Sequence, residues 1–364
     1  MAARRSLTLR RKKKAPEAPR VIRAFGTPAP AEARRRTICF VLSAEAAGHA
    51  LDHRPSRYRC FHWAEALQAA GHIVTVAPLG TFLTAPNPDF EVYIFHRPSM
   101  ADERLRTVLT ALKKLKKTII ADLDEFVFGS ERPSDQAQAL GMFDKITLNT
   151  HALSDAVRAH VGNLDLHVTP DALPPSLAGM YQVRQCHLEA RPPGALCYIA
   201  PEDGNGMAFR RIWDVVYKVL SEDEDASLTC FGELDAPDVL TSHPRVFFRP
   251  RELPVYRTMT LAEFGCVLAP LLPGDHSRCA SRADYIETTL AGARYICSPF
   301  PDLPPLRQAN LKTAITPSDW YEQLVFAVET PIRQEEITSC VERTFEARST
   351  SRTLNDFVNF LEHS

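Results

Sequence analysis

The chain has 364 residues, of which 45% are hydrophobic and 24% are charged. This composition is typical of folded globular proteins, and the length suits two domains rather than one. No stretch approaches the roughly eighteen apolar residues of a membrane-spanning helix, and the basic N-terminus leads into no apolar core, so we expect neither a span nor a secretory signal.

The first predicted segment is a disordered basic arm. Residues 1–36 hold twelve Lys/Arg and two Asp/Glu, a local charge of +10, whereas the rest of the chain carries −11. Four prolines and little apolar content favour disorder. The arm is either a solvated tail or, through residues 4–14, a peripheral contact with an anionic membrane on the inner face of the cell. We expect no nucleic-acid binding, because the folded part is acidic.

Short apolar runs alternate with amphipathic stretches from Thr37 onward. Such alternation predicts a parallel sheet with helices on both faces. On the first helix we interpret His62 as part of an exposed amphipathic surface. The expected strands are Thr37–Ser43, Ile73–Ala77, Val92–Phe95, Thr118–Ala121 and Ile146–Leu148, and the expected helices are Arg57–Ala70, Ala101–Lys117 and Ser154–His160.

A proline-rich stretch, Thr169–Pro193, has no clear period and predicts a linker. We therefore predict two Rossmann-like α/β domains that face each other across a cleft, over 37–180 and 181–332, with C-terminal helices over 333–364 that pack back on the first domain. The second series comprises strands Cys197–Ala200, Ser227–Phe231, Val246–Phe248, Cys266–Pro270 and Tyr295–Ser298, with helices Met207–Leu220, Ala280–Leu290 and Trp320–Glu329.

Nine cysteines occur singly along the chain, without a CxxC pair. Several of them fall inside apolar, strand-like runs, where a thiol packs as a small hydrophobic group. This pattern predicts reduced, buried thiols in a cytoplasmic protein rather than a disulfide framework or a zinc site.

The stretch His276–Gly292 carries the clearest binding signal. The start of a helix offers free N–H groups and a positive dipole end, which suit a diphosphate. Glu287, one to two turns along, could accept hydrogen bonds from ribose hydroxyls. Ser281, Arg278 and Arg282 beside the helix start could serve the same nucleotide, and Arg210, from the helix expected over Met207–Leu220, could meet its phosphate charge. In the glycine loop Pro201–Gly206, Gly204 would let backbone amides approach a phosphate.

Strand ends of the first domain supply the remaining candidates. Because strand ends face the cleft, we assign a substrate or catalytic role to His96 and Asp124. Asp122 and Asp124 stand two residues apart, but we expect an acceptor or structural role for them and no metal. Arg57, Arg59 and Arg97 are the candidates for an anionic acceptor or the donor sugar.

These segments resemble, in order and spacing, GT-B fold glycosyltransferases of the family 4 type (GT4-like). The segments in question are RYRCFHWAEALQAAGHIVTV, IADLDEFVF, DKITLNTHAL with VTPDALP, DASLTCFG, PRVFF, and APL followed by S-x-x-x-x-x-E-x-x-x-x-G and SP.

The resemblance implies a retaining, metal-independent transferase without a cofactor. It would move a sugar from a nucleotide sugar to a glycan, lipid-linked or protein acceptor, as in polysaccharide biosynthesis, and Glu287 would bind the donor ribose. Three positions depart from the family pattern: Asp284 replaces a phosphate-binding Lys, Cys279 a sugar-binding Glu, and Asp171 an Asn. The alternatives are a catalytically degenerate GT-B binding protein and another GT-B-like enzyme, such as a sugar epimerase or phosphorylase.

Overall fold

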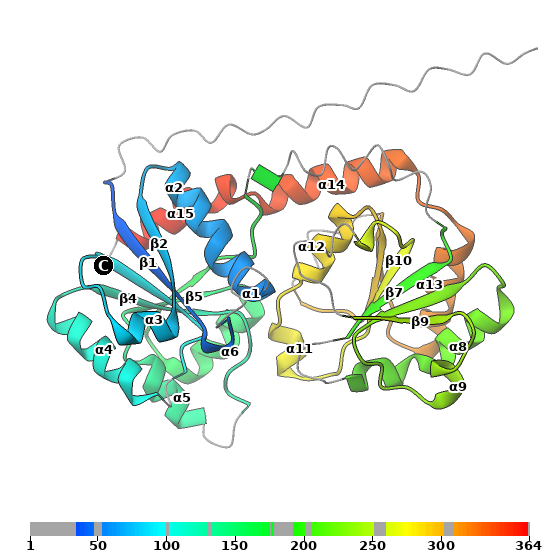
Figure 1. The fold of residues 1–364 in the computed structure, drawn as a ribbon, viewed down its shortest axis with the longest axis horizontal. Helices are drawn as coiled ribbons and strands as arrows, with labels where there is room; N and C mark the ends of the chain where they lie inside the picture. Colours follow the sequence, from blue (N-terminus) through cyan, green and yellow to red (C-terminus); the bar gives the residue numbers. More distant parts are fainter. Residues whose placement is uncertain are drawn as a thin grey trace, which may run out of the picture.

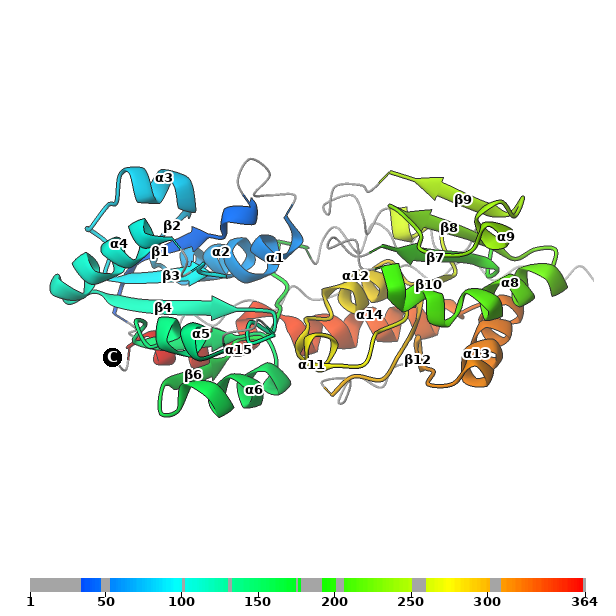
Figure 2. The same ribbon diagram turned by 90° about the horizontal axis from the view of Figure 1, so that it is seen from below.

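The structure is a computed structural model that describes residues 34–46, 53–99, 102–129, 133–174, 176–177, 192–200, 206–250, 260–301 and 309–362. Its framework is two parallel six-stranded sheets, one in each half of the chain, with helices on both faces of each (Figures 1 and 2). The predicted pair of Rossmann-like α/β domains is thereby confirmed. The basic segment 1–33 lies outside the described residues.

The first sheet has the strand order β2-β1-β3-β4-β5-β6. Its central strands are continuous apolar runs because helices cover both faces, as parallel sheets require. Helix α4 is amphipathic and begins at the N-cap Asp102, whose carboxylate accepts from the backbone N–H of Arg104. The elements are β1 Thr37–Leu42, β2 Ile73–Pro78, β3 Val92–His96, β4 Thr118–Leu123, β5 Lys145–Leu148, β6 Asp165–Val168, α1 Arg54–Ser56, α2 His62–Ala69, α3 Leu79–Thr84, α4 Glu103–Lys114, α5 Pro133–Leu140 and α6 His151–Val161.

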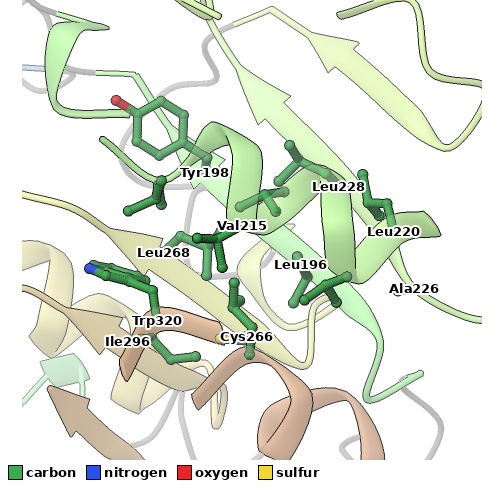
Figure 3. Close-up of a cluster of buried hydrophobic side chains, with 14 of the residues drawn as sticks. Leu196, Tyr198, Val215, Leu220, Ala226, Leu228, Cys266, Leu268, Ile296 and Trp320 are labelled. Atoms are coloured by element: carbon green, nitrogen blue, oxygen red, sulfur yellow. The ribbon is translucent and has the colours of Figure 1, made fainter. Parts of the chain in front are cut away.

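The second sheet has the order β12-β11-β10-β7-β8-β9. Its core between the sheet and helices α8 and α13 is built from aliphatic side chains closed by Trp320 (Figure 3). The elements are β7 Ala195–Ile199, β8 Ser227–Phe231, β9 Val246–Arg249, β10 Cys266–Ala269, β11 Arg294–Cys297, β12 Leu311–Thr313, α8 Trp213–Glu222, α9 Asp238–Thr241, α11 Asp275–Cys279, α12 Ala283–Leu290 and α13 Pro317–Glu329.

Two C-terminal helices lead back from the second domain to the first (Figures 1 and 2). Helix α14 (Gln334–Arg348) packs on α12, and α15 (Thr350–Glu362) packs on α2. The rings of Trp63 and Phe357 meet edge to face with centroids 4.8 Å apart. Residues Leu354, Phe357, Val358 and Leu361 of α15 are all buried in the core of the first domain.

Several elements depart from the sequence-based expectations. The helix expected over Arg57–Ala70 is preceded by the short α1 and contains a π-helical stretch, Arg57–Phe61, before α2. The helix expected over Ala280–Leu290 begins only at Ala283, as α12, and a short helix that was not expected, α11, precedes it and ends at Cys279. Five other short elements were not expected from the sequence: α3, α5, β6, α9 and β12.

His62 does not lie on an exposed surface, so our interpretation of it was wrong. The side chain is buried, and its Nδ1 lies 2.8 Å from the carbonyl oxygen of Ala172, to which it donates. Burial lowers the pKa of His62 to about 4. This face of the helix points toward the chain segment that leaves the first domain, a contact that helical periodicity alone does not reveal.

Candidate functional site

In each sheet, the first strand lies where the strand order reverses. The crevice beyond the carboxyl ends at that point is where doubly wound sheets bind ligands. In the second sheet the reversal lies between β7 and β10, and a pocket of about 270 Å³ opens there. We call it the switch-point pocket. Its walls include residues 198–200 at the end of β7, residues 267–272 in and after β10, and the segment that joins α11 to α12, together with Arg54 from the first domain.

A wider pocket of about 670 Å³ continues along the carboxyl ends of β10 and β11. It shares Leu271, Leu272 and Ser277 with the switch-point pocket, so the two form one trough. Arg278 lines this second part, where its guanidinium lies 3.6 Å from Asp275. The trough thus combines apolar walls with the guanidinium of Arg278.

Glu287 is a buried interdomain ion pair partner in this structure. The side chain is only 1% exposed, although it belongs to α12. Nη2 of Arg57 lies 3.0 Å from its Oε1, and Nη1 of Arg54 lies 3.8 Å from its Oε2. Within the described residues, Glu287 is not part of the switch-point pocket lining, whereas Arg54 is. The carboxylate and the pocket are therefore linked through a first-domain arginine.

The strand ends of the first domain hold a buried polar network around Arg59. The guanidinium makes two hydrogen bonds to Asp122, of 2.5 and 3.2 Å, and a third to the carbonyl of Thr169. Asp171 lies 3.8 Å away, and Thr147 Oγ1 donates to Asp122 over 2.7 Å. Arg59 is 2% exposed, so its charge is neutralised inside the protein rather than offered to a substrate. Of the acceptor and structural roles expected for Asp122, this contact with Arg59 is structural.

His96, Arg97 and Asp124 form a second cluster at the ends of β3 and β4. Arg97 donates to both carboxylate oxygens of Asp124, with Nε 2.5 Å from Oδ1, and Nε2 of His96 lies 3.5 Å from the same oxygen. Burial raises the pKa of Asp124, but the guanidinium of Arg97 and the neighbouring His96 outweigh it and hold that pKa well below its usual range. Arg97 has a φ of 47°, a conformation that costs energy for a residue with a side chain and concentrates at functional sites.

Further side-chain contacts join the two domains beside the switch-point pocket. The hydroxyl of Ser281 donates to Asp171, and that of Thr150 donates to the carbonyl of Cys279 over 3.2 Å. The thiol of Cys279 is fully buried and lies 3.6 Å from the carbonyl of Ala152 in α6. Cys279, which stands where the resembling family has a sugar-binding glutamate, is therefore buried in the domain interface.

The other predicted donor residues do not all lie at the switch-point pocket. Arg210 is exposed and pairs with Asp235 at 2.8 Å, away from the switch-point pocket. Arg282 and Ser281 both line that pocket. Asp284 lines it too, with Oδ2 accepting from the hydroxyl of Tyr295 over 2.5 Å. Gly204 lies outside the described residues.

Sequence reasoning missed Arg54, which joins the pocket and Glu287. The motif that indicated Arg57 and Arg59 begins at Arg57, and nothing in the spacing marks the preceding turn. Pro55 at the start of the short α1 is the one local signal, because proline favours the first turn of a helix. The contact itself joins positions more than 230 residues apart and is visible only in three dimensions.

The remaining expectations concern thiols, metals and membranes. Eight cysteines fall within the described residues, and all eight are free and buried; Cys186 lies outside them. In the same residues there is no group of three or more His, Cys, Asp or Glu side chains that could hold a metal ion. None of the described helices is both long and apolar enough to cross a membrane.

Comparisons with known proteins find similarity in structure but not in sequence. No protein-family model matches the chain, and no curated protein matches it. An alpha-glucosyltransferase solved with UDP-glucose and DNA containing an abasic site superposes with a TM-score of 0.63 at 10% identity, over 90% of this chain and all of the other. HepE of Anabaena, solved with UDP and glucose, gives 0.58 at 11% identity, over 90% and 99%.

A putative UDP-N-acetylglucosamine 2-epimerase from Listeria monocytogenes is also similar, with a TM-score of 0.55 at 10% identity over 91% and 98% of the two chains. These similarities cover both domains, and they show that the chain has the GT-B fold. Since transferases and an epimerase share that fold, the chemistry has to be argued from the site.

Proposed function

We propose that the protein transfers a sugar from a nucleoside diphosphate sugar to an acceptor hydroxyl. The observation that carries the proposal is the switch-point pocket, which joins the strand ends of the second sheet to Arg54 of the first domain. A ligand in this pocket contacts both domains. A sugar donor needs such a place, because it has to meet the acceptor in the cleft between the domains. The structural similarity to UDP-glucose-bound transferases supports uridine diphosphate sugars as the first donors to test.

Donor binding would exchange the partners of Glu287. In the structure the carboxylate holds Arg57 and Arg54. If ribose hydroxyls take the carboxylate, both guanidiniums become available for the diphosphate, whose oxygens they can meet with two parallel hydrogen bonds. Arg282, which lines the same pocket, adds a third cation. These arginines would replace the lysine whose position Asp284 occupies.

The chemistry would rest on positioning and charge rather than on a covalent enzyme intermediate. The bond between the anomeric carbon and the β-phosphate oxygen breaks, the acceptor oxygen bonds to that carbon, and its proton passes to the departing phosphate. Arg54, Arg57 and Arg282 would stabilise the charge that develops on the phosphate. His96 and Asp124 are buried at the facing strand ends, where they would position Arg97 toward the sugar and the acceptor. Retention of configuration and independence of metal are implied by the family resemblance.

The acceptor class we propose is a glycan, a lipid-linked sugar or a protein. The reaction would take place in the cytoplasm, with the basic N-terminal segment as a candidate contact to an anionic membrane surface. The alpha-glucosyltransferase with a similar fold was solved with DNA, so duplex DNA belongs among the acceptors to be tested, although we do not expect it to bind.

The test combines binding and product analysis. We expect UDP-glucose or another nucleoside diphosphate sugar to raise the melting temperature. At a hundred times its Kd, a ligand increases the free energy of unfolding by about 2.7 kcal/mol. Slow release of nucleotide without acceptor, accelerated by acceptor, identifies a transferase. Isomerisation of the sugar with the nucleotide still attached would identify an epimerase. Binding without turnover on any acceptor would identify a degenerate binding protein, and no binding of any nucleotide would remove the proposal.

A matched pair of variants locates the donor. Arg54→Gln should weaken nucleotide diphosphate binding about tenfold, as expected for loss of one charge-assisted contact. Arg210→Gln removes the same charge from an exposed pair with Asp235 and should leave binding unchanged. If Arg210→Gln weakens binding and Arg54→Gln does not, the donor binds near the loop before Arg210 rather than in the switch-point pocket.

A further inference from the structure

A second interdomain pocket lies on the other side of the Ser281–Arg282 segment. Its volume is about 350 Å³, within the range of pockets that bind small molecules. Walls come from three parts of the fold: the ends of β5 and β6 in the first domain, the start of α12 in the second, and the junction of α14 with α15. We call it the hinge pocket, because the α14–α15 junction, where the chain returns to the first domain, forms one of its walls.

The hinge pocket is separate from the switch-point pocket. The two share only Ser281 and Arg282 among their described lining residues. The hydrogen bond from Ser281 to Asp171 joins the domains at this shared wall. Phe300 also lines the wider part of the trough, but the remaining lining residues of the hinge pocket belong to neither part, so a ligand there meets a largely different set of side chains.

The charge of the hinge pocket is positive. Three arginines line it, Arg282, Arg348 and Arg352, against one carboxylate, Asp171, which already faces Arg59 at 3.8 Å and accepts from Ser281. Guanidinium groups that converge on a cavity from three different elements are suited to an anion.

The pocket also holds buried polar atoms that lack a hydrogen-bond partner among the described residues. Asn149 lines it and is only 4% exposed. Its Nδ2 donates to the carbonyl of Asp124 over 3.0 Å, but Oδ1 has no partner there. Oγ1 of Thr353 is in the same state. A buried acceptor without a partner destabilises a protein and is rare in native structures, so both atoms indicate a ligand with hydroxyl groups.

An aromatic wall completes the site. Phe300 lines the hinge pocket, and the guanidinium carbon of Arg282 lies 4.8 Å from its ring centroid. The contact holds the Arg282 side chain against the ring and places a flat apolar surface beside the cations. A phosphorylated sugar is complementary to this combination, because it offers an anionic group, hydroxyls and an apolar ring face.

We propose that the hinge pocket binds a small hydroxylated anion of the sugar phosphate class, separately from the donor. Its anionic group meets Arg352 and Arg348, and its hydroxyls donate to Asn149 and accept from or donate to Thr353. Because both domains and the α14–α15 junction line the site, the bound molecule holds the domains in the arrangement of this structure. It thereby acts as an effector of the cleft rather than as a substrate. This proposal does not depend on the chemistry at the donor site.

The experiment uses the full chain with glucose 6-phosphate as the probe. Calorimetry measures its binding, and thermal unfolding measures its effect on the melting temperature. We expect saturable binding and a raised melting temperature, with glucose alone giving neither. Arg352→Glu should weaken binding at least tenfold. Arg343→Glu, the same charge change at an exposed site on α14, should leave it unchanged. Thr353→Val, which removes only the hydroxyl, should weaken it about fivefold without loss of stability.

A double comparison separates the two pockets. Arg352→Glu should leave UDP binding intact, and Arg54→Gln should leave glucose 6-phosphate binding intact. If glucose 6-phosphate affinity falls with Arg54→Gln and not with Arg352→Glu, the probe occupies the donor site and the proposal is overturned. Absence of binding by glucose 6-phosphate and by inorganic phosphate at millimolar concentration would overturn it as well.

Discussion

Glu287 links ligand binding to the stability of the domain interface, because Arg54 and Arg57 of the first domain hold its buried carboxylate. At Glu287, we expect substitution by alanine to weaken nucleotide binding and also to destabilise the unliganded protein. The reason is that Arg57, only 15% exposed, would keep its charge in a partly buried place without its partner. Breaking such a pair costs about 3 kcal/mol. Thermal unfolding with and without UDP measures both effects.

The control for this prediction is Glu342→Ala, which removes an exposed glutamate from α14. It should change neither the melting temperature nor UDP binding. The sequence alone predicts that Glu287→Ala leaves stability unchanged, because a ribose-binding side chain would face the cleft. An unaltered melting temperature would therefore support that expectation and contradict the buried ion pair.

His62 predicts a pH dependence of stability. Its pKa is about 4 in the folded protein and close to 6.5 in the unfolded chain. The unfolded state therefore takes up the proton first as pH falls, and the free energy of unfolding should decrease between pH 6.5 and 4. The stability contributed by neutral His62 is fully present above pH 6.5. The loss amounts to about 3 kcal/mol at most. Urea unfolding from pH 7 to 4 should show a flatter pH profile for His62→Gln than for the parent.

Asp284 places a negative charge in the pocket that we assign to a diphosphate. Asp284→Asn keeps the size of the side chain and an oxygen that can accept from Tyr295. We expect UDP to bind several-fold more tightly to this variant at low salt, with the difference shrinking as salt screens the charge. If calorimetry shows that UDP binds equally or more weakly to the variant, the diphosphate does not lie near Asp284.

At the scale of elements, α15 carries much of the first domain's core. Four of its apolar side chains are buried there, and burial of each contributes about 1.5–3 kcal/mol. Their sum is comparable to the whole stability of a typical domain, about 5–15 kcal/mol. A chain that ends at Ser349 should therefore lose cooperative folding of the first domain, seen as loss of near-UV circular dichroism. Asn355→Ser, at an exposed position of α15, scarcely changes the packing and serves as the control.

The strands were the elements best predicted from the sequence. Runs such as Thr37–Leu42 and Val92–His96 are β-branched or aromatic and almost continuously apolar, because both faces of a parallel sheet are covered. β6 was not predicted because DLHV mixes polar and apolar residues at an edge of the sheet. The short α11 was not predicted because its last residue, Cys279, is buried against α6 of the other domain, a tertiary contact that the local sequence does not reveal.

At the scale of the whole molecule, the GT-B fold could be predicted, but the contents of the cleft could not. The order of strands and helices follows from the chain, and the strand ends indicate which residues approach the cleft. Which of them meet each other depends on how the domains are docked. Arg59 and Asp122 were both candidates, and only the structure shows that they neutralise one another. The hinge pocket likewise combines positions from 149 to 353.

The basic N-terminal segment supplies a prediction for the complete chain. Arg34 and Arg36 lie beside Glu91, at 2.7 and 3.7 Å, so a chain that starts at Arg34 keeps both contacts. We expect it to fold and bind nucleotide like the full chain. It should sediment less with phosphatidylserine vesicles than the full chain does. This difference should vanish with added salt, because screening already limits the reach of exposed charges to about 8 Å at physiological ionic strength.

Equal vesicle binding by the two chains would leave the arm as a plain tail. A difference seen with duplex DNA and not with vesicles would instead contradict our expectation that nucleic acid is not a partner. Neutral phosphatidylcholine vesicles give the baseline for both chains.

The return of α15 to the first sheet has a consequence for the order of events on the ribosome. The six strands of the first sheet leave the ribosome early, yet the helix that seals one of its faces is synthesised only after the whole second sheet. Trp63 and its neighbours thus stay exposed while the other domain is made, although domains usually fold in the order of their synthesis. Chaperone binding to the nascent chain should accordingly persist until Leu361 has emerged.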